Sequence, residues 1–168
     1  MEFSSFMNES QTVLVQQSWP KLVSKSFWSS FYLNLFERSP SYQLFFNRFA
    51  RVPREELQFN VHFLAHASRT GFAFNAAIDL LGNSLEFRRI LEDLGAKHRQ
   101  FHLTAEHFQI VKDVLMDCIE NRLKNESNNT ERTLTESWKL CISLVIGVIK
   151  DSAIGDIHSD ASMTRKPN

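Results

Sequence analysis

Apolar side chains recur every three or four residues through most of this chain, a period typical of helices that bury one face. Nowhere does a long stretch alternate apolar and polar residues as a half-buried strand would. Helix breakers are scarce, since the sequence has only 5 glycines and 4 prolines, whereas its 15 phenylalanines supply large core side chains. The pattern therefore predicts an all-α protein with an interior rich in aromatic rings.

Caps and breakers divide this pattern into helices. Pro20 cannot donate a backbone hydrogen bond, so we expect the first helix to kink or end near it. Ser39 followed by Pro40 is typical of the start of a short helix. Pro53, followed by Glu55 and Glu56, is typical of a helix start. From Leu57 onward the apolar period predicts a long helix, which the glycine-containing segment 82–84 is expected to end.

The second half of the chain divides in the same way. One short helix is expected from Leu85 to about Arg99, and Thr104 is expected to start the next one. Thr133 and Glu136 have the spacing of a capping box, which satisfies free backbone N–H groups at a helix start. The last helix is therefore expected to begin at Thr133.

Length and charge favour one soluble domain. Within the 168 residues we expect a flexible leader at residues 1–8, a folded domain at residues 9–150 and a polar, disordered tail at residues 151–168. The 19 basic and 19 acidic residues are interspersed, so no basic stripe indicates binding to nucleic acid or to an anionic membrane.

Two further features favour a cytoplasmic location. The N-terminus lacks the pattern of a signal peptide, and the longest apolar run, within residues 140–149, is too short to span a bilayer. Cys118 and Cys141 each lie among apolar residues at helical spacing, which favours free thiols in a reducing compartment. A disulfide between neighbouring helices is the alternative.

Two histidines are candidate metal ligands. His98 lies one helical turn after Leu94 and therefore shares its buried face. A single histidine in such a place is more often a structural or surface residue than a ligand. His66 lies upstream on another helical pattern, however, and Phe46 and Phe49 precede it closely. Together these residues favour a site between two helices.

A series of residues along the chain resembles the globin family in order and spacing. The series is Trp19, Pro40, Phe46, Phe49, His66, Leu94, His98, Phe108 and Trp138. The resemblance extends from about Glu9 to about Lys150, and its details are closest to neuroglobin-like or invertebrate intracellular globins. It implies a globin fold of about eight helices around a pocket for haem b, with His98 as the proximal iron ligand.

The resemblance also implies the walls of the haem pocket. Phe46 corresponds to the ring that stacks against the porphyrin, and Phe49 to the ring that supports it. Polar residues at the open edge are candidates to bind the haem propionates. The expected cofactor-binding residues are Phe46, Arg48, Phe49, Arg69, Thr70, Leu94, Lys97, His102, Leu103, Phe108 and Val111.

On the opposite side of the haem, the resemblance places His66 and Tyr32 against the bound ligand. A hydrogen bond from either residue to iron-bound oxygen would contribute about 1.5–3 kcal/mol. The alternative for Tyr32 is a core residue whose hydroxyl reaches solvent. Thr70 departs from the bulky aliphatic residue usual in globins, so we expect a more polar pocket that admits water. Oxygenated iron in such a pocket is expected to lose an electron faster.

The leading interpretation is a haem-binding globin that reversibly binds oxygen, carbon monoxide or nitric oxide, for storage, scavenging or sensing. The alternative is a six-coordinate redox globin in which His66 is the sixth iron ligand and an external donor supplies electrons for nitrite, superoxide or nitric oxide chemistry. A third interpretation is a haem-free sensor with a globin fold. No arrangement of nucleophile and base indicates a dedicated enzyme, and we expect a monomer or a homodimer.

Overall fold

The computed structural model describes residues 7–124 and 130–155 of the chain. Within these residues the chain forms helices and no strand, so the all-α fold class is confirmed. The α-helices are α1 (Glu9–Leu22), α2 (Phe27–Arg38), α3 (Val61–Asp79), α4 (Ser84–His98), α5 (Ala105–Leu123) and α6 (Thr130–Ile154). The 3₁₀ helices are η2 (Pro40–Phe45), η3 (Arg54–Phe59) and η4 (Arg99–Phe101). None of the described helices is long and apolar enough to cross a membrane.

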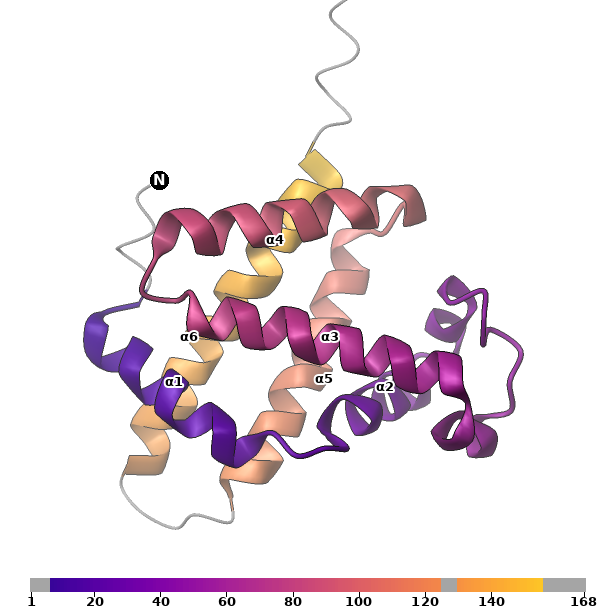
Figure 1. The fold of residues 1–168 in the computed structure, drawn as a ribbon, viewed down its shortest axis with the longest axis horizontal. Coiled ribbons are helices and arrows are strands. Elements are labelled where there is room, and N and C mark those ends of the chain that lie inside the picture. The colour runs from indigo at the N-terminus through magenta and orange to yellow at the C-terminus, as the bar shows by residue number, and fades with distance from the viewer. Residues whose placement is uncertain (1–6, 125–129, 156–168) are drawn as a thin grey trace, which may run out of the picture.

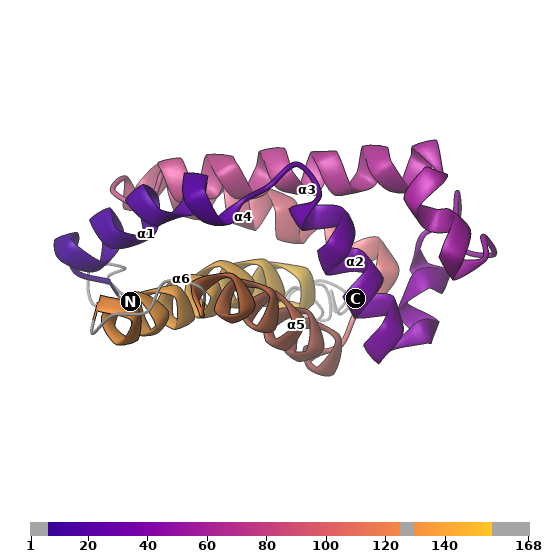
Figure 2. The ribbon, with the colours of Figure 1, turned by 90° about the horizontal axis from the view of Figure 1, so that it is seen from below.

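The helices form two layers that cross each other. Helices α1, α3 and α4 lie in one layer, and α5 and α6 lie side by side in the other (Figures 1 and 2). Helix α2 lies at one end of the molecule and packs on α3 and on α5, so it joins the layers. The most extensive helix packing is that of α4 and of α5 against α6.

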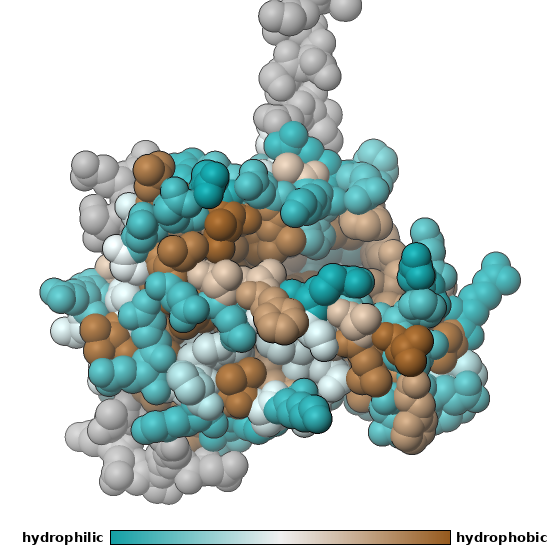
Figure 3. Space-filling view, viewed as in Figure 1, coloured by the Kyte–Doolittle hydropathy of each residue, from teal (hydrophilic) through white to brown (hydrophobic). Residues whose placement is uncertain are grey.

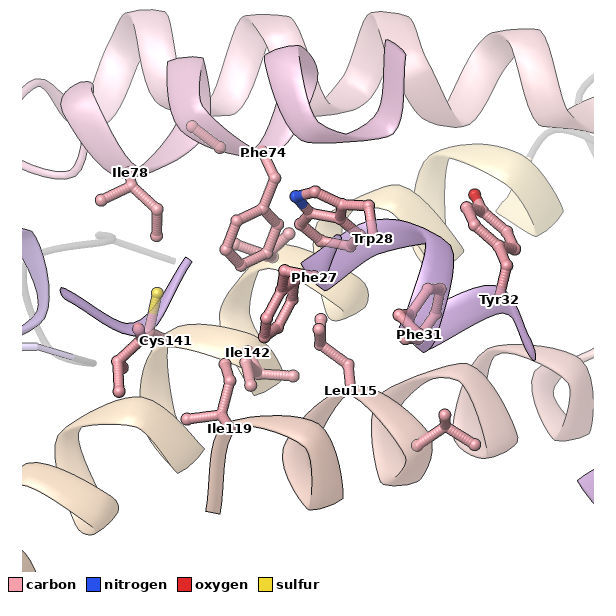
Figure 4. Packing of buried hydrophobic residues seen from close by; sticks show 14 of the residues in the cluster. Phe27, Trp28, Phe31, Tyr32, Phe74, Ile78, Leu115, Ile119, Cys141 and Ile142 are labelled. Atoms are coloured by element: carbon pink, nitrogen blue, oxygen red, sulfur yellow. The ribbon is translucent and has the colours of Figure 1, made fainter. Parts of the chain in front are cut away.

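The core between the layers is dominated by aromatic rings, as the composition predicts. The ring of Trp19 packs on those of Phe27, Phe74 and Trp138, at centroid distances of 5.4, 5.0 and 5.5 Å. Figure 4 shows Phe74 reaching from α3 toward Phe27 and Trp28. Rings from four helices therefore meet at one point and fix how the two layers cross.

Several predicted helix starts and ends are confirmed. Helix α1 runs through Pro20 and ends at Leu22, so the early end predicted from the proline is correct to within one turn. Pro40 occupies the first turn of η2, as predicted. Thr104 caps α5, and its partner in the capping box is His107.

The long helix predicted from Leu57 to residues 82–84 is wrong at its start, and its predicted end is correct to within one turn. Leu57 lies in η3, and α3 begins only after Asn60, whose side-chain oxygen accepts hydrogen bonds from the backbone N–H groups of His62 and Phe63. This cap turns the chain between the two helices, because the side chain replaces the carbonyl partners that a continuous helix would supply. Helix α3 ends at Asp79, before the glycine.

The predicted start of the last helix is also wrong. Thr133 lies inside α6, which begins at Thr130, and its carbonyl accepts a hydrogen bond from the Ser137 hydroxyl. At its other end α6 continues to Ile154, into the segment expected to be a tail, because the end of α6 is bonded to α4. The remainder of the predicted leader and tail, residues 1–6 and 156–168, lies outside the described residues.

Candidate functional site

The last turn of α4 presents the imidazole of His98, which is half-buried. Its Nδ1 lies 2.7 Å from the carbonyl oxygen of Leu94, one turn earlier. A carbonyl oxygen can only accept, so Nδ1 carries the proton and donates it. In the neutral form of the ring, the lone pair is then on Nε2, which is the arrangement that a metal-binding histidine needs.

Helix α6 holds this part of α4 in place at a close crossing. A Cβ atom at Gly95 would lie 2.5 Å from the carbonyl oxygen of Ile149 and 2.6 Å from Cβ of Ser152, so only glycine allows the two backbones to approach this closely. The Ser152 hydroxyl donates to the Glu92 carbonyl at 2.7 Å. Both contacts lie within two turns before His98 along the chain and fix the orientation of α4.

A second bond joins the two helices just beyond His98. Nε of Arg99 donates to the Ser152 carbonyl at 2.8 Å. Sequence reasoning did not identify Gly95, Arg99 or Ser152 as residues that position His98. The glycine inside a helix was a usable signal of a close approach, whereas nothing near Ser152 in the sequence indicates its contact with α4.

Three polar side chains meet on the facing side, where α2 packs on α3. The Tyr32 hydroxyl from α2 lies 2.9 Å from Nε2 of His66 and 2.8 Å from Oγ1 of Thr70. His66 and Thr70 are one turn apart on α3, and Oγ1 of Thr70 also lies 3.2 Å from the His66 carbonyl oxygen. The structure therefore brings together three residues that the sequence assigned to the distal side.

Burial keeps this group of side chains uncharged. It raises the pKa of Tyr32 to about 12. Burial also lowers the pKa of His66 to about 4, and the charges of Arg69 and His98 add to this shift. The two imidazoles come from different helices, His66 from α3 and His98 from α4.

An aromatic corner covers His66. The rings of Phe46 and Phe49 are stacked, with centroids 5.0 Å apart and an interplanar angle of 15°, and the Phe46 ring is 4.8 Å from the imidazole. The side-chain amide of Gln43 holds the corner by donating to the carbonyls of Phe49 and Val52 at 2.8 and 2.9 Å. Sequence reasoning missed Gln43, because its role depends on a turn that no local pattern predicts.

The remaining candidate residues divide into apolar and exposed polar groups. Phe108 is buried, and Leu94, Leu103 and Val111 are half-buried and pack against the core. Figure 3 shows apolar side chains gathered between α3 and α4, where the surface is hollowed. The cationic candidates for the edge of the pocket are exposed: Arg48, Arg69, Lys97 and His102.

His102 has an additional structural role at this edge. Its backbone has φ of 50°, in the left-handed region, and its N–H donates to the Arg99 carbonyl. This conformation turns the chain from η4 toward α5. It carries the His102 side chain outward, where it is exposed.

These features define an all-α protein with an imidazole-lined site between two helices, and comparison with known proteins gives the family. A model of the globin family matches residues 29–149, so the chain belongs to the globin family. This confirms the resemblance found in the sequence, and membership of this family supports a haem cofactor.

Solved structures show the same fold. A globin of Drosophila melanogaster superposes with a TM-score of 0.74 at 24% identity, over 85% of this chain and 93% of that one. A hexacoordinated heme protein from an anhydrobiotic tardigrade gives a TM-score of 0.77 at 16% identity, over 88% and 95% of the two chains. The globin-like protein Glb-12 of C. elegans gives 0.76 at 21% identity, over 90% and 91%.

The residues present fit a haem. Nε2 of His98 has the lone pair that iron needs, and the Leu94 carbonyl holds the ring in the matching tautomer. Stacked phenylalanines and half-buried aliphatic residues suit the flat apolar ring, while exposed cations suit its carboxylates. The fit does not favour a haem-free sensor, in which large apolar side chains rather than two polar imidazoles would be expected to fill the space.

Proposed function

We propose that this chain binds haem b through His98 and reversibly binds oxygen and other diatomic ligands, such as carbon monoxide and nitric oxide, on the side of His66. Haem supplies an iron atom that can bind such a ligand. The observation that carries the proposal is the His98–Leu94 hydrogen bond of 2.7 Å, which prepares Nε2 as a metal ligand on a helix held by α6.

On the distal side, the chain supplies hydrogen-bond donors rather than charges. His66 is neutral near pH 7 because burial lowers its pKa to about 4, and a neutral imidazole N–H can donate to a polar ligand. One such bond is worth about 1.5–3 kcal/mol, or roughly ten- to a hundredfold in affinity. Tyr32 remains a second predicted ligand contact, and to donate to the ligand its hydroxyl would have to release Oγ1 of Thr70, which lies 2.8 Å away.

The other candidate residues retain their predicted roles. Phe46, Phe49, Leu94, Leu103, Phe108 and Val111 would enclose the haem ring. Arg48, Arg69, Lys97 and His102 are exposed, as side chains that bind propionates at the rim would be. Thr70 brings a hydroxyl to the distal side and makes it more polar than an aliphatic residue would.

We place this activity in the cytoplasm, in a monomer or homodimer. Cys118 and Cys141 are both free in the structure, which supports a reducing compartment. This also agrees with the sequence-based preference for free thiols over a disulfide.

Absorption spectra of the purified protein with added haemin test the proposal. The native chain should give ferric, ferrous and carbonmonoxy spectra of a histidine-ligated haem. His98→Ala should lose stoichiometric haem uptake or show an altered spectrum that added imidazole restores. His62→Ala is the matched control, since His62 is exposed on α3, and it should leave all spectra unchanged. Normal ligation in His98→Ala would refute the proposal.

A specific observation also favours the redox alternative. His66 is neutral near pH 7, as a second iron ligand would need to be, because burial lowers its pKa to about 4. Two of the similar structures are described as hexacoordinate, one from Drosophila melanogaster and one from a tardigrade. In that case ferrous, ligand-free protein would show sharp, split visible bands, and function would require an external electron donor. A single broad band would exclude this alternative.

A further inference from the structure

Three hydrogen bonds form a closed ring that begins and ends on His66. They join Nε2 of His66 to the Tyr32 hydroxyl at 2.9 Å, the Tyr32 hydroxyl to Oγ1 of Thr70 at 2.8 Å, and Oγ1 of Thr70 to the His66 carbonyl oxygen at 3.2 Å. Tyr32 is only 8% exposed, so water has little access to its side chain. The protons in this ring can therefore be assigned one by one.

The assignment starts at the carbonyl oxygen, which can only accept. Thr70 has one hydroxyl proton and donates it to the His66 carbonyl. Its oxygen must then accept the proton of the Tyr32 hydroxyl, which lies 2.8 Å away. Tyr32 has no other proton, so its oxygen accepts from Nε2 of His66. Nε2 therefore carries the proton of the neutral imidazole.

We propose that Tyr32 and Thr70 are positioning residues that hold His66 as its Nε2–H tautomer and so keep this nitrogen from becoming a sixth ligand of the haem iron. This inference rests on the proposed haem-binding function. Iron binds the lone pair of an imidazole nitrogen, and a protonated Nε2 has none to offer. The same Nε2–H can donate to a diatomic ligand when it releases the Tyr32 oxygen.

To coordinate iron through Nε2, His66 must lose its bond to Tyr32 and change tautomer. One proton leaves Nε2 and one is taken up at Nδ1, with no change in net charge. Phe46 and Phe49 also pack around the imidazole of His66, with their ring centroids 4.8 and 6.2 Å from its centroid. This packing limits how the imidazole can rotate. Both the hydrogen bonds and the packing thus oppose six-coordination.

The residue type at position 70 controls which group donates and which accepts in each hydrogen bond of this ring. With an aliphatic side chain there, the Tyr32 proton would have no oxygen to bind at that position. Tyr32 would then donate to Nε2 of His66, and the imidazole proton would lie on Nδ1. Thr70→Val, which keeps the shape and removes the hydroxyl, is therefore expected to invert the tautomer, whereas Thr70→Ser is expected to preserve it.

Long-range ¹H–¹⁵N NMR of ¹⁵N-histidine-labelled protein measures this tautomer directly, because protonated and unprotonated imidazole nitrogens resonate in different ranges. Spectra are recorded on the haem-free and the carbonmonoxy protein. We expect protonated Nε2 in the native chain and in Thr70→Ser, and protonated Nδ1 in Thr70→Val. Protonated Nδ1 in the native chain, or no change in Thr70→Val, would overturn the proposal.

The ferrous, ligand-free absorption spectrum gives a second measure. Thr70→Val and Tyr32→Phe should each raise the ratio of six- to five-coordinate haem by about fivefold, the effect of one neutral hydrogen bond. Thr70→Ser should retain the native ratio. Fully six-coordinate native protein would overturn the proposal, as would an unchanged ratio in both hydroxyl-deleting variants. Tyr32→Phe provides the test if Thr70→Val does not fold.

The two experiments separate this inference from the proposed function. The tautomer can be measured in haem-free protein, so it is tested even if haem is not taken up. Absence of haem uptake would refute the proposed function and leave the tautomer assignment standing. Normal haem uptake with an Nδ1-protonated His66 would refute the inference alone.

Discussion

Thiol reactivity in this chain is controlled by burial. Cys141 is 0% exposed, and burial raises its pKa to about 12. Cys118 is only half-buried, but burial still raises its pKa, and the side-chain amide of Asn34 lies 3.5 Å from its sulfur. Because the thiolate is the reactive form, both thiols should react slowly at neutral pH.

We expect Cys118 to react before Cys141 in native protein. At pH 8 a disulfide reagent such as DTNB should label one thiol per chain, at a rate that rises about tenfold per pH unit while the pH stays below the pKa of Cys118. Cys118→Ser should abolish this phase, and denaturant should expose both thiols. Equal native rates at the two cysteines would contradict the burial described above.

At the scale of single residues, the sequence identified side-chain types better than their partners. His66 and His98 were selected from type and spacing, whereas Tyr32 and Thr70 came from the resemblance to globins. The structure places His66, Tyr32 and Thr70 in one hydrogen-bonded ring. Which atom donates to which was not predictable, since it depends on where α2 crosses α3. The assignments of these residues to a haem remain predictions.

At the scale of elements, the crossing of α4 and α6 determines where His98 lies. Gly95 and Ser152 are in contact there, and the closest approach leaves no room for a methyl group at position 95. Gly147 also lies inside α6, but a Cβ atom there would meet nothing within 4 Å. Both glycines lie inside helices, but their surroundings in space are opposite.

The matched substitutions Gly95→Ala and Gly147→Ala test this difference. Gly95→Ala should lower the free energy of unfolding by about 1–3 kcal/mol, because overpacking forces the helices apart. Gly147→Ala should raise it by about 0.5–1 kcal/mol, because alanine has the higher helix propensity. Urea denaturation followed by circular dichroism measures both. Equal effects of the two substitutions would mean that the α4–α6 crossing is not close.

Helix boundaries show the limits of local patterns at this scale. The pattern predicted the start of α5 at Thr104, because the cap and its partner His107 lie within one turn. It failed at Leu57, where the apolar period continues without a break across two separate helices. Asn60 ends one helix and caps the next, and a single asparagine inside an apolar pattern is a weak signal.

At the scale of the whole molecule, the two layers are held together by the aromatic core. Phe74 on α3 is 7% exposed and packs on the rings of Trp19 and Trp28, each at a centroid distance of 5.0 Å. Phe72, two positions earlier on the same helix, is 75% exposed. The pair allows the same substitution to be compared at a core and at a surface position.

Phe74→Ala should cost about 3–5 kcal/mol of unfolding free energy, because it removes a buried ring and leaves a cavity where the layers meet. Phe72→Ala should change stability by no more than about 0.5 kcal/mol, as is usual for exposed positions. Chemical denaturation of both variants, monitored by tryptophan fluorescence, provides the measurement. A small effect of Phe74→Ala would show that the packing of Phe74 on Trp19 and Trp28 does not hold the layers together.

The sequence by itself determined the helical fold class and the aromatic interior, because helical period, caps and large rings are local features of the chain. The family came from the resemblance of an ordered series of residues to globins, which the family match confirms. The sequence also supplied the imidazoles and phenylalanines of the candidate site. Only the tertiary structure decided that Ser152 bonds to α4 and that Tyr32 lies within hydrogen-bond distance of His66 and Thr70. These contacts join residues from different helices or depend on where helices cross, and a local pattern contains no information about such crossings.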